Sequence, residues 1–286
     1  MKIIDLLKQN KPMLSFEVFP PKTSSTYDSV FKATQAIAQL KPPFISVTYG
    51  AAGGARFYSL DIARNLLAAG VTPLAHLTCV SSTKEQIIQK LGELKEAGIE
   101  NIMALRGDIP EGFDASGPRD YKYASELIRD IKSYGDFCIG GACYPEGHVE
   151  SANLQEDIVH LKEKADAGCD FFTTQMFFDN EILFSYLYKL REAGISTPVI
   201  AGVMPVTNAN QIKRITALSG TYLPGRFKRI IDRFGDSPES MEKAGIAYAT
   251  EQIISLFAGG ITAVHVYSMN KAHVAAKIQE NLKGII

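Results

Sequence analysis

Short apolar runs alternate with amphipathic segments along the whole chain. Most of these runs are continuously apolar, which is typical of parallel strands that are covered on both faces. Each run has the length of a strand rather than that of a helix. The runs span Met13–Phe19, Phe44–Tyr49, Thr72–Thr78, Asn101–Arg106, Phe137–Tyr144, Asp170–Met176, Pro198–Met204 and Ile261–Tyr267. The pattern therefore predicts eight parallel strands.

The segments between these runs carry helix start and stop signals. Thr83 and Gln86 form a capping-box pattern at the start of one segment. Three segments end in Ala-Gly, and glycine at this position ends helices because it readily adopts a positive φ. We therefore expect helices over Tyr27–Leu40, Thr83–Ala97, Asn153–Ala167 and Asn180–Ala193.

The segment Thr207–Gly260 is too long for one helix. Breaks around Leu223-Pro224-Gly225 and near Gly235–Pro238 divide it into two or three helices. Eight βα units in succession favour a closed barrel over an open sheet. The predicted fold class is α/β: a (β/α)8 TIM barrel formed by residues 1–286 as a single domain, with extra helices between strands 7 and 8.

Composition and charge limit the partners of the chain. It has 286 residues, 46% of them hydrophobic and 21% charged, with a net charge of −1. A near-neutral protein has no general attraction to nucleic acid or to an anionic membrane, so an acidic ligand must be held by local charges. Met1–Pro12 does not resemble a signal peptide, and no run of about 20 apolar residues predicts a membrane span. The sparse cysteines lack C-x-x-C spacing, which indicates reduced thiols and a cytoplasmic protein.

Polar residues recur at the predicted carboxyl ends of the strands, where the active site of an α/β barrel lies. Glu17 stands out because it lies between Phe16 and Val18 in an otherwise apolar strand. Burial disfavours a carboxylate and raises its pKa, which suits a general acid. The alternative is a structural glutamate satisfied by an arginine or by backbone amides.

Other candidates are less distinctive. Asp108 follows predicted strand 4 and is either aimed at a ligand or paired with Arg106. His76 and His148 are as readily structural as ligand-binding, whereas His265 is expected to be structural. The five histidines form no zinc-type spacing, so no catalytic metal is predicted.

The stretch Gly50–Ala55 is rich in glycine and follows predicted strand 2. It matches neither the G-x-G-x-x-G pattern nor a P-loop. It is either a flexible connection or a loop that lets a flat ring approach the backbone.

Nine strings of residues, taken together, resemble the bacterial FAD-dependent methylenetetrahydrofolate reductase family. They occur in order from strand 1 to strand 8, across nearly the whole chain. The strings are Ser15–Pro21, Val47–Gly50, Ala75–Cys79, Ala104–Asp108, Tyr123–Ser125, Tyr144–His148, Thr174–Asp179, Gly202–Val206 and Tyr267–Asn270.

This resemblance implies that FAD binds at the carboxyl ends of the strands. The residues that match the family's FAD contacts are Thr48, His76, Arg106, Gly107, Asp108, Tyr123, Ala124, Tyr144, His148, Asp157 and Lys164. Those that match its folate contacts are Glu17, Asp108, Gln175, Gln211, Tyr267 and Lys271. Glu17 and Asp108 would be the catalytic residues.

The implied reaction is the reduction of 5,10-methylenetetrahydrofolate to 5-methyltetrahydrofolate by ping-pong hydride transfer from NADH or NADPH through FAD. Glu17 would promote opening of the imidazolidine ring, and Asp108 would hydrogen-bond the pterin. Arg106 and Lys164 would supply positive charge for the pyrophosphate. The sequence leaves open a ferredoxin-type donor on a partner subunit, and we expect a homo-oligomer.

The chain departs from the family pattern in several places. Ile215 stands where an aromatic residue stacks on the substrate, and Lys271 stands where an arginine is common. His160 and Glu163 replace an asparagine and a basic residue near the cofactor phosphates. Alternative functions are another flavin-dependent barrel oxidoreductase, a non-redox barrel lyase and a non-catalytic subunit. No predicted strand contains a lysine, which argues against a Schiff-base aldolase.

Overall fold

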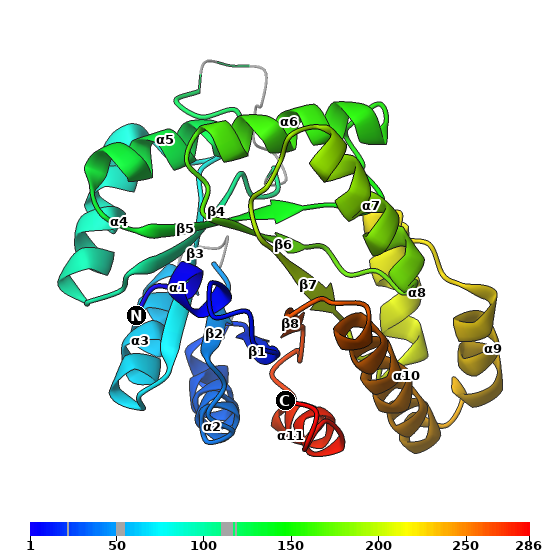
Figure 1. Cartoon of the computed structure of the whole chain (residues 1–286). Coiled ribbons are helices and arrows are strands. Elements are labelled where there is room, and N and C mark those ends of the chain that lie inside the picture. Colours follow the sequence, from blue (N-terminus) through cyan, green and yellow to red (C-terminus); the bar gives the residue numbers. More distant parts are fainter. Residues whose placement is uncertain (22, 50–54, 110–116, 118) are drawn as a thin grey trace.

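The computed structural model describes residues 1–21, 23–49, 55–109, 117 and 119–286. Eight parallel strands form a closed barrel in chain order, and β8 pairs with β1. Figure 1 shows helices surrounding these strands. The predicted α/β barrel is confirmed. The strands are β1 (Met13–Val18), β2 (Phe44–Val47), β3 (Thr72–Thr78), β4 (Asn101–Leu105), β5 (Cys138–Cys143), β6 (Phe171–Thr174), β7 (Val199–Val203) and β8 (Ala263–Val266).

Most strands are shorter than the apolar runs that predict them. Phe19, Tyr49 and Tyr144, for example, lie beyond the last residue of their strands. Residues at the carboxyl ends leave the hydrogen-bonded ladder and enter the loops that build the site of such a barrel. Apolar character alone does not mark this transition, so the predicted strand ends are too late.

All four expected helices are confirmed, with ends shifted by a few residues. Thr83 and Gln86 form the predicted capping box. Gly98, Gly168 and Gly194 all have positive φ just after helix ends. The helices that accompany the first six strands and the last are α2 (Tyr27–Ala38), α3 (Ala55–Ala68), α4 (Lys84–Glu96), α5 (Ala124–Tyr134), α6 (Leu154–Asp166), α7 (Asn180–Glu192) and α11 (Ala272–Asn281).

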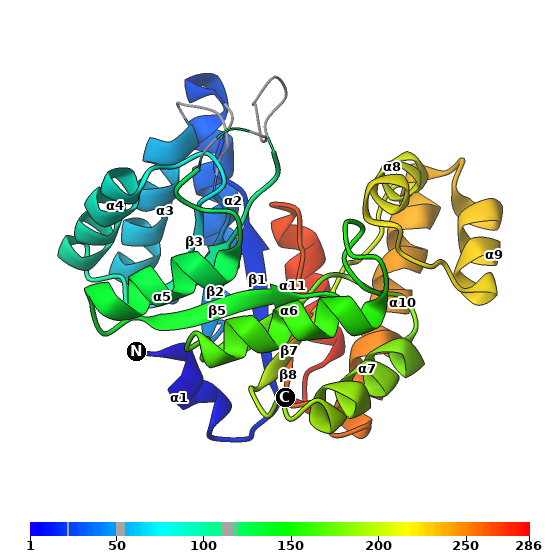
Figure 2. The same cartoon turned by 90° about the horizontal axis from the view of Figure 1, so that it is seen from above.

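Extra helices lie between β7 and β8, as predicted. They are α8 (Ala209–Ser219), α9 (Gly225–Phe234) and α10 (Pro238–Ala258), so both predicted breaks are confirmed. Ser237 caps α10 by accepting a hydrogen bond from the backbone of Ser240. Figure 2 shows α8 and α9 projecting to one side of the barrel.

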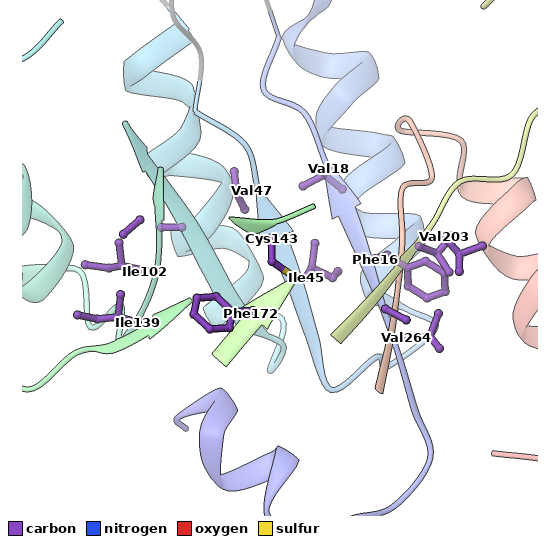
Figure 3. Close-up of a cluster of buried hydrophobic side chains, with 14 of the residues drawn as sticks. Phe16, Val18, Ile45, Val47, Ile102, Ile139, Cys143, Phe172, Val203 and Val264 are labelled. Carbon is purple, nitrogen blue, oxygen red and sulfur yellow. The ribbon is translucent and has the colours of Figure 1, made fainter. Parts of the chain in front are cut away.

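The strand side chains divide into two sets by alternation. The outward set, which includes Phe16 and Val18, packs against the surrounding helices (Figure 3). The inward set fills the barrel at the amino ends of the strands, where Met13, Phe44 and Phe171 are buried.

A short helix, α1 (Ile3–Leu7), covers this amino end, and the sequence analysis did not predict it. The Ile3 side chain is fully buried against the inward set, and its backbone N–H donates to Asn101 Oδ1 at 2.8 Å. Figure 2 shows α1 below the barrel, away from α8 and α9. One end of the barrel is therefore closed by apolar packing, which leaves the carboxyl ends of the strands for a ligand.

The state of the cysteines and the character of the helices relate to two predictions made from the sequence. Cys79, Cys138, Cys143 and Cys169 are all buried and free. None of the helices in the described part of the chain combines the length and the apolar character that crossing a membrane requires.

Candidate active site at the carboxyl ends of the strands

A cavity of about 700 Å³ lies beyond the carboxyl ends of β2 to β5 and is bordered by α5 and α6. Its volume is within the range of about 300–1,000 Å³ that is typical of small-molecule sites. Every residue that matches the family's FAD contacts lines it. These residues are Thr48, His76, Arg106, Gly107, Asp108, Tyr123, Ala124, Tyr144, His148, Asp157 and Lys164. The structure therefore brings the predicted cofactor group together.

Two fixed cations of the described chain line this cavity, and they have different environments. The ammonium of Lys164 donates to the carbonyl of Ala142 at 2.9 Å, and burial lowers the pKa of Lys164 although Asp157 lies nearby. The guanidinium of Arg106 donates through Nη1 and Nη2 to both carboxylate oxygens of Glu150, at 2.5 and 2.7 Å. Arg106 is thus paired with Glu150 and not with its sequence neighbour Asp108, which is exposed at the cavity.

The backbone approaches the cavity closely at Gly107. This residue has a φ of +85°, and a Cβ there would lie 2.9 Å from Cβ of Thr78. Both features require glycine. Ala124 and Ser125, in the first turn of α5, also line the cavity. First-turn N–H groups lack partners within the helix, which favours an anionic ligand at this point.

His148 lines the cavity and also organises the loop after β5. Its Nδ1 accepts a hydrogen bond from the backbone N–H of Glu150 at 3.2 Å, and its ring packs edge-on to Tyr144 with centroids 4.7 Å apart. The sequence left His148 open between a structural and a ligand-binding role, and its position allows both.

Glu17 lies on the inward face of β1, with 6% of its surface exposed. Its carboxyl group is 4.0 Å from Nε2 of His76, which lines the cavity. Burial raises the pKa of Glu17 to about 8 and lowers the pKa of His76 to about 4. At neutral pH both groups are therefore uncharged, and Glu17 holds a proton beside His76, which lines the cavity.

A chain of hydrogen bonds lies below Glu17 and ends at Ser46, whose contact lowers the pKa of Glu17 against the larger effect of burial. His265 is buried, and its Nδ1 is 2.8 Å from Ser15 Oγ while its Nε2 is 3.0 Å from Ser46 Oγ. In the tautomer with a proton on Nδ1, the neutral ring donates to Ser15, which itself donates to the carbonyl of Val264, and Nε2 accepts from Ser46. The Ser46 hydroxyl also hydrogen-bonds Glu17, and this contact offsets part of the rise that burial causes in the pKa of Glu17. His265 is structural, as expected.

The residues matched to folate contacts form a second group outside the lining of the cavity, apart from Asp108. Tyr267 follows β8 and donates from its hydroxyl to the carbonyl of Thr174 at 2.5 Å. Lys271 donates to Thr207 Oγ1 at 2.6 Å. Of the other three, Glu17 lies on β1, Gln175 follows β6 and Gln211 lies in the first turn of α8.

An apolar cluster lies beside this second group. Tyr267 and Ile215 pack against a buried set that consists of Met176, Phe178, Met204, Val206, Ile212, Phe227, Ile231 and Met241. The position where the family has a stacking aromatic residue is thus occupied by an aliphatic side chain that contacts this cluster. Glu17 and His76 lie where the two groups of predicted residues meet.

Two site residues escaped the sequence analysis. Ser46 is paired with Glu17 in the register of β1 and β2, and a serine in the apolar run Phe44–Tyr49 was a usable signal. Glu150 carried no signal, because a single acidic residue in a loop is ordinary. The glycine-rich stretch Gly50–Ala55, left open between a flexible connection and a loop that lets a ring approach, falls almost entirely outside the residues that the structure describes.

Comparison with known proteins identifies relatives over nearly the whole chain. The family model described as Methylenetetrahydrofolate reductase matches residues 2–283. The 5,10-methylenetetrahydrofolate reductase of Escherichia coli (strain K12) is 34% identical over 275 residues, which cover 96% of this chain and 92% of that protein. Methylenetetrahydrofolate reductase (NADH) 1 of Arabidopsis thaliana is 34% identical over 306 residues, covering all of this chain but 51% of that protein. The chain therefore spans about half the length of this plant relative.

A solved structure shares the fold. It is described as an uncharacterized protein from Clostridium thermocellum that binds two copies of 5-methyl-5,6,7,8-tetrahydrofolic acid. The two chains cover each other completely with a TM-score of 0.65, at 16% sequence identity. This likeness concerns the barrel alone, whereas the sequence matches identify the group of proteins. By those matches, the chain belongs to the methylenetetrahydrofolate reductase family.

Proposed function

We propose that this chain reduces 5,10-methylenetetrahydrofolate to 5-methyltetrahydrofolate, with FAD as cofactor and a nicotinamide dinucleotide as electron donor. Family membership supports the substrate. The observation that carries the proposal is the position of a buried, protonated Glu17 next to His76, at the edge of a cavity suited to a flavin. The structural relative described as binding 5-methyl-5,6,7,8-tetrahydrofolic acid adds support for a folate ligand.

The residues around the cavity fit an anionic flavin. Lys164 and Arg106 supply positive charge, and the first turn of α5 offers backbone N–H groups. Gly107 has no side chain beside Thr78, so a flat ring could approach the backbone there closely. When bound, the flavin would supply hydride acceptance from the nicotinamide and hydride donation to the folate.

The protein's own contribution to folate reduction begins with Glu17. Its proton would be donated to the substrate to promote opening of the five-membered ring, which creates the electrophilic iminium carbon. His76 is neutral and lies 4.0 Å away. Because burial lowers its pKa, His76 does not take the proton from Glu17 to form an imidazolium–carboxylate pair. Ser46 holds the carboxyl group in place from below.

The remaining predicted residues would position the folate. Asp108 is exposed at the cavity and would accept hydrogen bonds from the pterin. Gln175, Tyr267 and Lys271 follow β6 or β8, on the other side of Glu17. The apolar cluster beside Tyr267 would contact the flat parts of the substrate, with Ile215 contributing aliphatic surface.

The electron donor is proposed to be NADH or NADPH, used in a ping-pong sequence. The name of the Arabidopsis relative, which includes NADH, favours NADH. Cytoplasmic location and a homo-oligomeric, single-domain enzyme are parts of the same proposal.

The test is spectroscopic and uses the purified chain of residues 1–286. We expect flavin absorption bands, bleaching of these bands by NADH without oxygen, and their recovery when methylenetetrahydrofolate is added. The variant Glu17→Gln should lose the recovery step and keep the bleaching. Equal loss of both steps would remove the proton-donor role from Glu17. A chain that binds no FAD would refute the cofactor assignment and favour a non-redox function of the barrel.

A further inference from the structure

We propose that Glu150 is a competing carboxylate that occupies Arg106 until a phosphate group of the ligand displaces it. This inference rests on the proposed function, because it names the residue that controls how the flavin dinucleotide gains its cation. Glu150 would make binding depend on the phosphate groups and not on the flavin ring alone.

The contact between these side chains has the geometry that a phosphate would need. Nη1 and Nη2 of Arg106 each donate to one oxygen of Glu150, at 2.5 and 2.7 Å. A phosphate uses the same two-pronged edge of a guanidinium. The remaining Nε–H donates to the carbonyl of Gly107 at 3.2 Å. A phosphate and Glu150 therefore compete for the same donors.

Arg106 is the fixed member of the pair. It directly follows β4, and its carbonyl accepts hydrogen bonds from the backbone N–H groups of Cys79 and Val80. Its side chain is 23% exposed. These contacts fix the backbone of Arg106, and the bond from Nε to the carbonyl of Gly107 retains the guanidinium at the cavity when Glu150 leaves.

Glu150 is the member that can leave. Its side chain is 54% exposed, so water can solvate the carboxylate once it is released. Its backbone N–H bonds to His148, which leaves the side chain free to rotate without moving the loop. Displacement therefore requires a change of side-chain rotamer and little else.

The charge of the cavity makes this competition matter. Among the described residues, five carboxylates and two fixed cations line it. The carboxylates belong to Asp108, Glu150, Glu156, Asp157 and Glu163. With Glu150 bonded to Arg106, an approaching phosphate meets a surface in which negative charge predominates. When Glu150 is released, the guanidinium of Arg106 becomes available to a phosphate group. A ligand that lacks phosphate has no group to bond to this cation, so its affinity does not increase.

The experiment measures binding of FAD, riboflavin and inorganic pyrophosphate to the chain of residues 1–286 by titration calorimetry. For Glu150→Gln we expect the dissociation constants of FAD and pyrophosphate to fall about tenfold, because a neutral amide holds Arg106 less strongly than a carboxylate. The dissociation constant of riboflavin should change less than about twofold. Glu150→Asp retains the charge but shortens the side chain, and should give an intermediate result.

Glu156→Gln is the matched control, because it removes one carboxylate of the same cavity whose recorded hydrogen bond is to the backbone N–H of Ala152 and not to Arg106. It should tighten FAD binding by less than about threefold. The proposal is overturned if Glu150→Gln leaves phosphate affinity unchanged or weakens it, or if Glu156→Gln has an equal effect. If no variant binds FAD, the proposed cofactor fails, but pyrophosphate binding to Glu150→Gln still decides the competition.

Discussion

The carboxyl group of Glu17 lies 4.0 Å from Nε2 of His76, and both groups are uncharged at neutral pH. An ion pair at this distance would keep Glu17 ionised. Burial instead raises the pKa of Glu17 to about 8 and lowers the pKa of His76 to about 4. Burial therefore keeps an available proton on Glu17, beside a residue that lines the cavity, which is what a general acid requires.

Folate reduction should depend on pH through Glu17. Below pH 8 the group is protonated and the rate of methylenetetrahydrofolate reduction by the prereduced enzyme should be constant. Above pH 8 the rate should fall about tenfold per pH unit, because the proton donor is lost. Stopped-flow measurement of each half-reaction checks this result. Flavin reduction by NADH serves as the control, and an identical decline there would contradict the assignment.

The burial of Glu17 should also appear in stability. Between pH 4.5 and about 8 the unfolded chain carries an ionised Glu17, whereas the folded chain holds it protonated. Folding then takes up a proton, so the free energy of unfolding falls as pH rises through this window. Glu17→Gln carries no carboxyl group and should not show this fall in the free energy of unfolding. The free energy of unfolding of the variant minus that of the wild type should therefore rise between pH 5 and 8 and then level off. At pH 7 this difference should be on the order of 3 kcal/mol larger than at low pH.

Urea unfolding at pH 5, 7 and 9 measures this difference. His76 and His265 titrate on the acid side in both proteins, so their contributions largely cancel. The control is Glu192→Gln, at the exposed end of α7, where the difference from the wild type should be small and constant. A constant difference for Glu17→Gln would show that its carboxyl group is ionised in the folded protein.

Gly107 offers a test of close backbone approach. Gly107→Ala combines a φ of +85° with a Cβ only 2.9 Å from Cβ of Thr78. Gly194→Ala has a similar φ of +74° but nothing within 4 Å of the new Cβ. The control should lose about 1–2 kcal/mol of stability from backbone strain alone. We expect Gly107→Ala to lose more and also to weaken FAD binding, as measured by urea unfolding and flavin titration. Equal losses would show that the contact with Thr78 relaxes without cost.

The fold was predictable because its signals are local and repeated. Each apolar run marks a strand, and the breaks in Thr207–Gly260 separate α8, α9 and α10 through glycine and proline. Helix α1 was missed because five residues give no periodic pattern. Its role depends on Ile3 meeting strand residues far along the chain, and no local signal reports such a contact.

The site was predictable to the extent that strand ends converge. The residues that line the cavity come from successive strand ends, from the start of α5 and from one side of α6, and barrel closure brings them together. The pairing of Arg106 with Glu150 was not predictable, because 44 positions separate them and Asp108 offered a nearer partner. The chain of bonds from Ser15 through His265 to Ser46 depends on strand register, which composition does not reveal.

Ile3 should be a determinant of stability. Its side chain is fully buried against the inward residues of the barrel. Ile3→Ala leaves a cavity there and should lower the free energy of unfolding by about 2–5 kcal/mol. Ile88→Ala is the control, because that side chain is 54% exposed on α4 and its removal should cost less than about 0.5 kcal/mol. Similar losses in thermal or urea unfolding would mean that α1 does not seal the barrel.

Lys164 should bind the ligand, whereas Lys162 on the same helix should not. Lys164 lines the cavity and its ammonium is held by the carbonyl of Ala142, while Lys162 is exposed and pairs with Asp166 at 3.5 Å. Lys164→Met keeps the aliphatic volume but removes the cation beside Asp157. We expect its dissociation constant for FAD to rise at least about tenfold, because a charge-assisted bond to the ligand is lost. Lys162→Met should bind FAD as the wild type does. If both variants retain full affinity, the anionic part of the ligand is held at Arg106 and at the start of α5 without help from Lys164.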